Sequence, residues 1–515
     1  MWTVIILLSI FTFAECKFMQ VNTTTRMFTD AAGRERIFHG VNVVYKVAPY
    51  YPPLSSFHPQ LSFGDEDVEF LVQNGYSMVR LFVSWRGVEP EKDSYNSSYL
   101  DVIEGIVNKL GESGIYSVLD CHQDLMSPKF CGEGFPDYAT LYENRSSKSL
   151  PFPVPIPSLT PYKINNTTGY PYRDDCAKHP FYLYYLSDAC CKAWQSLYDN
   201  DEGILERFGL FWEQVAQRFS SNEFVLAYEL LNEPWAGDIY SYPQDFLPDV
   251  INRKYLLPLY QRLHQSIRKH DDNHIIFFEP VSDFVSEVVG PSWFGEGPGG
   301  HEYDNRQAFS FHIYCALMKK GQPSNIPICK DIESNLFSAR MLDMEEMGLA
   351  GFVTEWGAYD DFTTESDSFR DAQDITSFAD RFLLSWSYWQ FKGYGDITTQ
   401  SNSDEGFWNA QGKLEELKVR TLSYPYAMSV GGHYKSMQFV RETSRFELTY
   451  VVAASASDNT TIFLSEKFYY PNGFNATVMP STWATLQHRP PYLLVKHTSV
   501  AQAGQVISVG IAPVS

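Results

Sequence analysis

The chain has 515 residues, of which 44% are hydrophobic, and its formal net charge is −22 at neutral pH. A chain of this length can bury a large core and is expected to form more than one domain. The excess of acidic residues excludes functions that depend on binding polyanions, namely nucleic-acid binding and electrostatic docking on anionic membranes.

The first 16 residues, MWTVIILLSIFTFAEC, form an apolar stretch too short to span a bilayer comfortably. Small residues follow at Ala14 and Cys16, so we predict a secretory signal peptide over 1–16, with an uncleaved anchor as the alternative. No later segment is apolar enough for a transmembrane helix. The predicted location is extracellular or a digestive lumen, with the lysosome as alternative. The chain also has sequons for N-glycosylation, which are consistent with secretion. They lie at Asn22, Asn96, Asn144, Asn165, Asn166, Asn459 and Asn475.

Cysteines are placed as expected for a secreted chain, in which disulfides are common. Cys315 and Cys329 flank a short loop and are expected to pair. Cys121 lies in an apolar strand and is the best candidate for a free buried thiol. Zinc is the competing interpretation, but no CxxC pair supports it, and we predict no metal or cofactor. Two of four cysteines in one long segment are expected to form a second disulfide: Cys131, Cys176, Cys190 and Cys191.

Eight apolar, β-rich runs mostly alternate with helical patterns. The predicted helices span 65–75, 99–114, 204–220 and 255–271, with further patterns near 332–348 and 368–381. The predicted strands span 37–44, 77–85, 115–124, 225–234, 274–280, 308–314, 351–357 and 383–391. Continuous apolar runs are typical of parallel strands covered on both faces. The pattern predicts an α/β fold, a (β/α)₈ TIM barrel with insertions. A doubly wound sheet is the alternative, but no glycine-rich phosphate turn follows the first strand.

Two segments depart from the βα repeat. A cysteine- and proline-rich insertion near 125–203 follows the third strand, and insertions of this length are usually functional or disordered. After Tyr424, short β-rich runs at regular spacing predict a C-terminal all-β sandwich domain over 425–515. An extension of the barrel surface is the alternative. The catalytic barrel is then predicted over 17–424.

Polar residues gather at the carboxyl ends of the predicted strands, where barrels of this kind carry their active sites. Glu233 follows the fourth strand and Glu355 ends the seventh, so the two carboxylates would face each other across the barrel mouth. Glycoside hydrolysis needs such a pair, because one acid protonates the leaving oxygen while the other attacks the anomeric carbon. The other strand-end candidates are Arg80, His122, Asp124, Asn232, His312, Tyr314, Trp389 and Gln390.

Several of these residues suit particular tasks. Arg80 and Tyr314 are expected to hold Glu355 ionised, by charge and by hydrogen bond. Asn232 is expected to bond the 2-hydroxyl of a sugar, and Trp389 offers an apolar face for the ring. Taken singly, each has a structural alternative, such as an ordinary ion pair for Arg80. Their common position at one end of successive strands favours a site.

The strand-end residues, in this order, resemble the active-site signature of glycoside hydrolase family 5 over roughly residues 30–420. Within that family the chain is similar to the endoglycoceramidases, in the segments HGVNVVYKVAPYYP, LDCHQD, LLNEPWAGD, FVTEWGAYDD and SWSYWQFK. The resemblance implies a retaining endo-glycosidase that cleaves the β-glycosidic bond between oligosaccharide and ceramide in glycosphingolipids. Glu233 would be the acid/base and Glu355 the nucleophile. Trp356 stands where the family motif has Phe, which we interpret as a tolerated aromatic exchange.

The resemblance also implies which residues hold the glucose beside the scissile bond. They are Lys46, His122, Asp124, Asn232, Trp389 and Gln390, with Trp194 a weaker candidate. The insertion and the loop 291–297 are candidates for lipid contact, at a micelle or lipid surface, with packing surface as the equal alternative.

Two other functions stay open from the sequence. One is a related family-5 hydrolase, either a β-glucosidase or glucosylceramidase or an endo-glucanase. The other is a non-catalytic glycan-binding barrel, which the presence of both carboxylates disfavours.

Overall fold

The computed structural model describes residues 18–143, 163–282, 290–315, 326–357, 362–396, 398, 405–454 and 456–514. Its centre is a closed barrel of parallel strands in the order β10-β11-β4-β5-β6-β7-β8-β9. The barrel confirms the predicted fold class, and each of its strands falls on a predicted one. The strands are β4 His39–Val43, β5 Met78–Phe82, β6 Tyr116–Asp120, β7 Val225–Glu229, β8 Ile275–Phe278, β9 Gln307–His312, β10 Ala350–Gly357 and β11 Ser385–Trp389.

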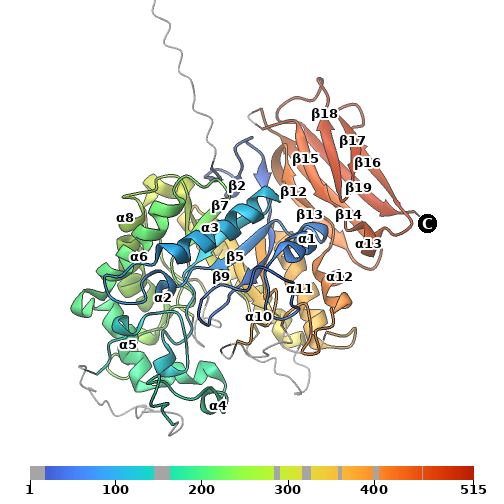
Figure 1. Ribbon diagram of the computed structural model, residues 1–515. Helices are drawn as coiled ribbons and strands as arrows, with labels where there is room; N and C mark the ends of the chain where they lie inside the picture. The colour runs from blue at the N-terminus through green and yellow to red at the C-terminus, as the bar shows by residue number, and fades with distance from the viewer. Residues whose placement is uncertain are drawn as a thin grey trace, which may run out of the picture.

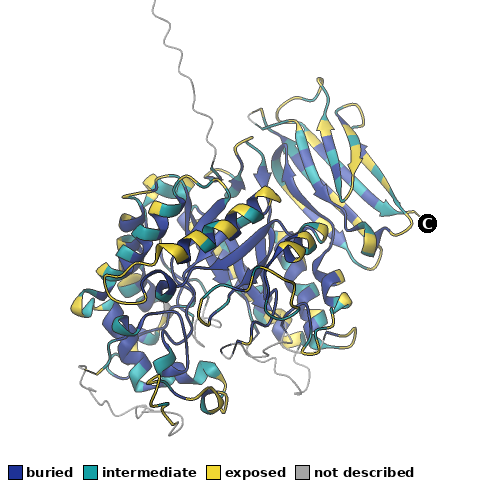
Figure 2. Ribbon diagram, in the orientation of Figure 1, coloured by how far each residue is buried: buried dark blue, intermediate teal, exposed yellow. Residues whose placement is uncertain are grey.

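Helices cover the outside of the barrel (Figure 1). In α3 the buried residues Leu100, Ile103, Val107 and Leu110 recur at helical spacing and form one apolar stripe. Figure 2 shows the result, with buried strands and helices that expose their outer faces. The longer helices are α1 Asp65–Gln73, α3 Ser97–Glu112, α5 Asp188–Tyr198, α6 Ile204–Phe219, α8 Leu257–Ile267, α10 Ile326–Met347 and α11 Asp367–Phe382. Shorter helices are α2 Trp85–Val88, α4 Arg173–Cys176, α7 Pro248–Ile251, α12 Glu416–Leu422 and α13 Glu466–Tyr469.

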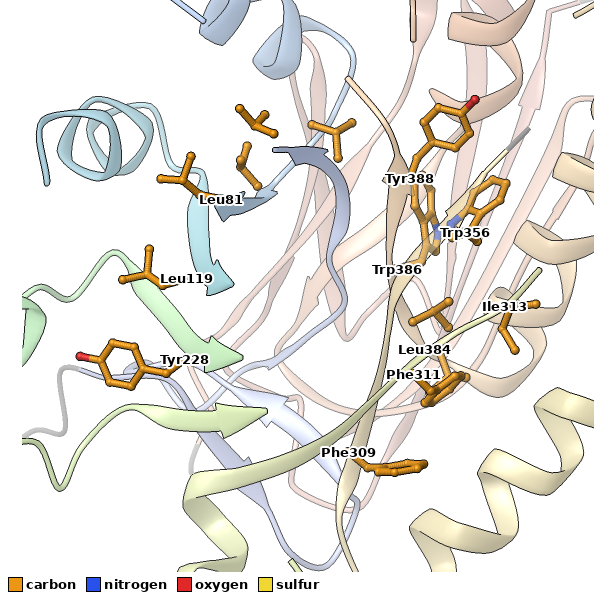
Figure 3. Packing of buried hydrophobic residues seen from close by; sticks show 14 of the residues in the cluster. Leu81, Leu119, Tyr228, Phe309, Phe311, Ile313, Trp356, Leu384, Trp386 and Tyr388 are labelled. Carbon is orange, nitrogen blue, oxygen red and sulfur yellow. The ribbon is translucent and has the colours of Figure 1, made fainter. Parts of the chain in front are cut away.

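The barrel strands bury side chains on both faces. Figure 3 shows Leu81, Leu119 and Tyr228 on one wall, pointing away from Trp356 and Trp386 on the opposite wall. A second apolar cluster includes Phe28 of β2 (Met27–Thr29), whose ring packs against those of Phe38, Phe277 and Phe352. Apolar side chains thus form these parts of the core, and the polar residues of the candidate site lie at the carboxyl ends of the barrel strands.

Two antiparallel sheets form the all-β part of the chain beside the barrel (Figure 1). The four-stranded sheet has the order β13-β14-β19-β16, formed by Gly432–Val440, Arg445–Val452, Val506–Pro513 and Phe474–Met479. The seven-stranded sheet has the order β1-β2-β3-β12-β15-β18-β17. Its strands are Gln20–Asn22, Met27–Thr29, Glu35–Arg36, Tyr426–Val430, Asn459–Phe463, Tyr492–His497 and Ala484–Arg489. The predicted C-terminal β domain is confirmed, and β1, β2 and β3, which lie in the range 17–424 that we assigned to the barrel, join its larger sheet.

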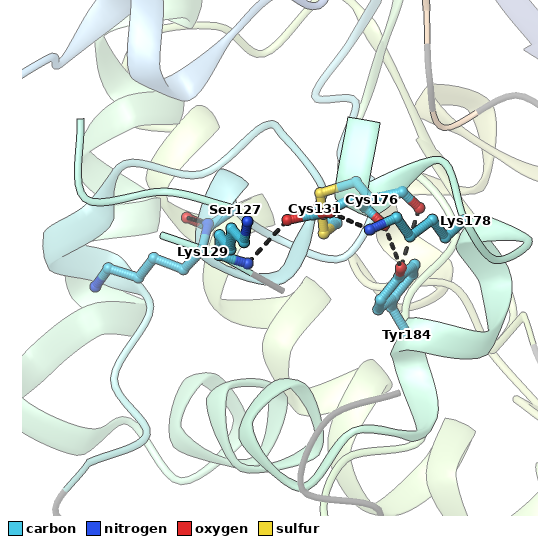
Figure 4. Close-up of a disulfide and its surroundings, with 8 residues drawn as sticks. Ser127, Lys129, Cys131, Cys176, Lys178 and Tyr184 are labelled. Carbon is cyan, nitrogen blue, oxygen red and sulfur yellow. Dashed lines mark hydrogen bonds and ion pairs between the residues drawn. A yellow bond between two sulfur atoms is a disulfide. The ribbon is translucent and has the colours of Figure 1, made fainter. Parts of the chain in front are cut away.

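Among the described residues two disulfides are present: the predicted pair Cys315–Cys329, and Cys131–Cys176, which is the pairing adopted by the second disulfide expected among four cysteines of the insertion. The second ties the loop after β6 to α4 in the insertion (Figure 4). Cys121 is a free buried thiol, also as predicted. The predicted signal peptide lies outside the described residues. Within the described ranges, no helix is both long and apolar enough to cross a membrane.

Candidate active site

Arg80 of β5 lies at the centre of the polar cluster and is fully buried. Its guanidinium donates to Glu355 Oε2 at 3.1 Å and to Asn232 Oδ1 at 2.9 Å. It also donates to Asn42 Oδ1 at 3.1 Å and pairs with Glu229 through Nε. Arginine suits this position because its planar fork satisfies several acceptors at once. The predicted contact between Arg80 and Glu355 is therefore present.

Glu233 and Glu355 lie close together at the barrel mouth. One carboxylate oxygen of each, together with one ring nitrogen of His312, falls within 4.8 Å of the others. His312 Nδ1 lies 2.8 Å from Glu233 Oε1, and Tyr314 Oη donates to Glu355 Oε1 at 2.9 Å. A carboxyl separation of about 5–5.5 Å is typical of retaining glycosidases, and inverting enzymes need about 6.5–9.5 Å. The spacing favours retention.

The backbone conformation after β7 determines the position of the Glu233 side chain. β7 ends at Glu229, and the backbone of Glu233 adopts a positive φ of 39° just before Pro234. This conformation is strained for a residue with a Cβ, and such strain is characteristic of functional sites. Gln123 holds the turn by donating to the carbonyl oxygens of Asn232 and Glu233, at 2.8 and 3.1 Å.

Burial raises the pKa of Glu355, and the negative charge of Glu233 adds to this effect. The positive charges of His312 and Arg80 act in the opposite direction. The contacts expected to ionise Glu355 exist, yet burial outweighs them, so Glu355 ionises at a higher pH than an exposed glutamate. For His312, burial would lower the pKa, but Glu279 and Glu355 together with hydrogen bonding to Glu233 raise it well above its ordinary value.

Glu279, which the sequence analysis missed, completes the cluster. It follows β8, and it accepts the backbone N–H of Glu233 at 3.3 Å. Its Oε1 lies 3.4 Å from His312 Nε2 and 3.5 Å from Arg80 Nη2. Burial and the charge of Glu229 raise the pKa of Glu279 to about 7. The run FFEP at the fifth predicted strand ends in Glu-Pro, just as LLNEP does at the fourth. This shared Glu-Pro ending would have identified Glu279 from the sequence.

On the other side of Arg80, His122 and Trp389 stack face to face. Their ring centroids are 5.2 Å apart with an interplanar angle of 14°. His122 Nδ1 lies 2.8 Å from Asp120 Oδ2. Burial lowers the pKa of His122, but Asp120 outweighs it and raises the value to about 9. Trp389 is only 4% exposed, and Lys46 Nζ lies 4.9 Å from its ring centroid.

Lys46 links this stack to three buried acids. Its Nζ lies 2.5 Å from Asp124, 2.7 Å from Asp396 and 3.2 Å from Glu133. Burial opposes the charge of Lys46, but these carboxylates raise its pKa well above the ordinary value. Lys46 and Asp124 were predicted from the sequence. Glu133 and Asp396 were not, because they come from loops whose proximity no local pattern indicates.

Three further predictions differ in outcome. Trp194 is fully buried and packs near Phe135 and Tyr198, so it is not available to a sugar in this structure. Gln390 is also fully buried, and neither polar atom of its amide has a hydrogen-bond partner within the described part of the chain. In the loop 291–297, Phe294 is 3% exposed and packs on Phe278 and Phe309, which favours the packing alternative for this residue.

Two groups of acidic and imidazole side chains in the described ranges have the donor chemistry of a metal site. They are Glu229 with Glu279 and His312, and Glu233 with His312 and Glu355. In each group three potential ligand atoms lie within 4.8 Å of one another. Both groups belong to the carboxylate cluster already described.

A close carboxylate pair at the carboxyl end of a (β/α)₈ barrel, with a buried arginine beside one acid, defines a glycoside hydrolase. Comparison with known families agrees with this class. The family described as Cellulase (glycosyl hydrolase family 5) matches residues 55–395. The Glycoside hydrolase family 5 C-terminal domain matches residues 425–511. The chain belongs to glycoside hydrolase family 5.

Relatives named as endoglycoceramidases resemble the chain over most of its length. An endoglycoceramidase of Cyanea nozakii is 34% identical over 504 residues, which cover 96% of this chain and 93% of the relative. An endoglycoceramidase of Hydra vulgaris is 35% identical over 467 residues, with 90% and 84% covered. Endo-glycoceramidase II from Rhodococcus sp., solved as a ganglioside GM3 complex, has a TM-score of 0.73 at 20% identity. That comparison covers 95% of this chain and 99% of the solved one, and it supports the fold.

Proposed function

We propose that this protein is a retaining endo-glycosidase that hydrolyses the bond between the oligosaccharide and ceramide of glycosphingolipids, releasing intact glycan and ceramide. The observation that carries the proposal is the similarity to endoglycoceramidases across both the barrel and the β domain, at 34% identity with the Cyanea nozakii enzyme. One carboxylate oxygen of Glu233 and one of Glu355 lie within 4.8 Å of each other and of a ring nitrogen of His312, and this closeness of the two acids supports retention.

The proposed reaction has two steps. Glu355 attacks the anomeric carbon of glucose, and the bond from that carbon to the ceramide oxygen breaks. Glu233, which shares a hydrogen bond with His312, gives its proton to the departing oxygen. A water molecule then attacks the same carbon, Glu233 takes its proton, and the bond to Glu355 breaks. The two inversions retain the configuration, and both carboxyl groups return to their starting protonation states.

The surrounding residues support these steps in different ways. Arg80 and Tyr314 stabilise the charge on Glu355 before attack and after its release, because each donates a hydrogen bond to one of its oxygens. The proposed grip on glucose comprises Lys46, His122, Asp124, Asn232, Trp389 and Gln390. The buried amide of Gln390, which has no hydrogen-bond partner among the residues that the structure describes, supports its place in this set, because a buried amide is costly until a ligand satisfies it.

Product analysis with lactosylceramide tests the proposal. Release of intact lactose and ceramide is the expected result. Release of glucose or galactose alone would instead assign an exo-acting glycosidase, and binding without turnover would assign a glycan-binding barrel. Glu233→Gln and Glu355→Gln should each lower kcat by at least about 1,000-fold, because the first removes the acid/base and the second removes the nucleophile. The matched control is Glu365→Gln, at a side chain that is 90% exposed.

Azide rescue distinguishes the two roles. With an aryl glycoside that needs no acid assistance, azide should restore turnover of Glu233→Ala and give a β-glycosyl azide through the covalent intermediate. With Glu355→Ala, azide should attack directly and give the α-product. The reverse pattern of products would exchange the two assignments.

We also propose secretion, to an extracellular or digestive lumen or the lysosome, through cleavage of the segment 1–16. The two disulfides support an oxidising route. N-terminal sequencing of protein recovered from culture medium should begin near Lys17. Retention of Met1 on protein inside the cell would contradict this location.

A further inference from the structure

Glu279 lies beside the proposed acid/base, and neither step of the proposed reaction gives it a task. It follows β8 and is 2% exposed. Its Oε2 accepts the backbone N–H of Glu233 at 3.3 Å, at the residue whose positive φ of 39° marks a strained turn. Its Oε1 lies 3.4 Å from Nε2 of His312. One carboxylate therefore reaches both the backbone of Glu233 and the imidazole that contacts the Glu233 side chain.

His312 joins the two glutamates through its two ring nitrogens. Nδ1 lies 2.8 Å from Glu233 Oε1, and Nε2 lies 3.4 Å from Glu279 Oε1. An imidazolium ion donates from both nitrogens, whereas a neutral imidazole donates from one and accepts at the other. At 3.4 Å the Nε2 contact is an ion pair, and, counting the described residues only, Nε2 has no aligned hydrogen bond. Such contacts are often long in a free enzyme and shorten when the substrate binds.

The charge of Glu279 favours the protonated form of His312. Burial alone would lower the pKa of His312, and Glu279 makes the largest opposing contribution, so the pKa is raised well above its ordinary value. Glu355 acts in the same direction, and its Oε1 lies 3.8 Å from His312 Nδ1. His312 is then an imidazolium with one N–H toward each glutamate. The other titratable groups that face this pair are Arg80, Glu229, Tyr260, Tyr314 and Arg340.

Glu279 is itself held in place by neighbouring elements of the barrel. Tyr260 of α8 donates to the backbone carbonyl oxygen of Glu279 at 2.9 Å. Arg80 Nη2 of β5 lies 3.5 Å from its Oε1. Charged and dipolar groups that are fixed before the reaction need no reorganisation when charge develops. Glu279 is therefore placed to orient other groups.

We infer that Glu279 is a positioning residue for the acid/base. It holds the Glu233 backbone through Oε2 and keeps His312 as an imidazolium through Oε1, so that His312 Nδ1–H donates to Glu233 Oε1 and the transferable proton of Glu233 stays on Oε2. The inference rests on the proposed function, because it takes Glu233 as the acid/base. In the first step the proton on Oε2 passes to the ceramide oxygen, and in the second step a proton of the attacking water returns to Oε2. His312 and Glu279 keep their protonation states throughout.

Two aryl lactosides that differ in their leaving groups test this role in the full-length protein. Phenyl β-lactoside needs a proton on its leaving oxygen, whereas 2,4-dinitrophenyl β-lactoside releases a stable anion. The comparison is made at pH 8, where Glu279, with its pKa of about 7, is mostly ionised. Glu279→Gln should lower kcat/KM for the phenyl glycoside about 10- to 100-fold. The dinitrophenyl glycoside should lose less than about threefold, because its cleavage needs no acid.

The pH profile separates positioning from a purely structural role. Glu279→Gln removes a negative charge beside His312 and so lowers the pKa of the imidazolium. The alkaline limb of kcat/KM for the phenyl glycoside should therefore move to lower pH. Glu279→Asp keeps the charge, so its alkaline limb should lie closer to that of the wild type, and it provides the test if Glu279→Gln does not fold.

Glu229→Gln is the comparison variant, because Glu229 is an equally buried acid that pairs with Arg80. Arg80 supports Glu355, which both glycosides need, so both values of kcat/KM should fall by a similar factor. Glu302→Gln, at an exposed acid between β8 and β9, should change neither value. Equal losses on the two glycosides in a Glu279→Gln protein that unfolds at the wild-type temperature, or an unmoved alkaline limb, would overturn the inference. A wild-type protein that cleaves neither lactoside would instead contradict the proposed function.

Discussion

At the scale of single residues, Arg80 is the group on which the site depends. Four buried carboxylates contribute to raising its pKa, against the opposing effect of its own burial: Asp120, Glu229, Glu279 and Glu355. Removing the cation leaves those acids without their shared positive partner, and broken buried pairs cost far more than broken surface pairs. Arg80 therefore has a structural task as well as the proposed catalytic one.

Arg80→Met should lower the free energy of unfolding by about 3–5 kcal/mol, as expected when one partner of a buried ion pair is removed. Urea unfolding measures this loss. Arg218→Met is the control, because Arg218 pairs with Asp101 and Glu104 at the surface, where such pairs contribute about 0–1 kcal/mol. Equal losses in the two variants would contradict the central role of Arg80.

Tyr314 contributes a hydrogen bond to the carboxylate that we propose as nucleophile. Tyr314→Phe removes this donor and should lower kcat about 10- to 100-fold. Because the donor stabilises the ionised form, its loss should also raise the pKa of Glu355 and move the acidic limb of the kcat/KM profile to higher pH. Tyr434→Phe, which removes a hydrogen bond to Ala427 in the β domain, should change neither quantity.

At the scale of elements, the contact between α10 and α11 buries two acids. Glu333 of α10 and Asp371 of α11 are 0% and 2% exposed. Burial and the charge of Asp371 raise the pKa of Glu333 to about 11, while burial raises that of Asp371 to about 7. Asp374 adds to both shifts, and Lys330 opposes the first. The folded chain therefore binds protons here that the unfolded chain releases.

The sign of the resulting pH dependence follows from linkage. A carboxyl group whose pKa is raised on folding stabilises the fold at low pH, and this contribution is lost as the pH rises through its folded value. The urea midpoint should fall between pH 5 and pH 8. The fall should be smaller in the double variant Glu333→Gln, Asp371→Asn. Glu345→Gln, at an exposed residue of α10, should show the same fall of the urea midpoint with pH as the wild type. If the urea midpoint of the double variant fell with pH as much as that of the wild type, this explanation would be wrong.

At the scale of the whole molecule, the chain segment that precedes the first barrel strand pairs with the C-terminal β domain. β3 pairs with β12 through Arg36 with Ser429 and through Glu35 with Val430. Glu35 is 1% exposed and accepts the backbone N–H of Tyr434 at 2.8 Å. β3 thus has one of its pairing partners nearly 400 residues away in the chain.

Removing residues 425–515 should therefore yield an insoluble or poorly folded barrel, because β3 loses its pairing with β12 and the buried Glu35 loses the hydrogen bond from Tyr434. The measurement is the soluble fraction after expression, followed by thermal unfolding. Supplying residues 425–515 as a separate chain should restore solubility. A truncated protein with the unfolding temperature and activity of the full chain would show that the shared sheet is dispensable.

The sequence predicted much of the fold and half of the acid cluster for one physical reason. Parallel strands are buried on both faces, so their apolar runs stand out, and the first polar residue after each run marks the barrel mouth. Glu233 and Glu355 could be paired in advance because the carboxyl ends of all barrel strands meet at one face. Cys315 and Cys329 could be paired in advance because they flank one short loop, whereas the sequence left open which two of the four insertion cysteines form the second disulfide.

Tertiary structure alone decided three matters. Asp396 reaches Lys46 and Glu35 reaches Tyr434 across long sequence separations, and no local pattern encodes contacts of that kind. The burial of Trp194 depends on how the insertion packs. The position of the insertion depends on contacts with distant segments, such as the hydrogen bond from Arg173 to the carbonyl oxygen of Gly395. The sequence by itself determined which side chains stand at the barrel mouth, through strand periodicity, whereas the shape and reach of the site were decided by long-range packing.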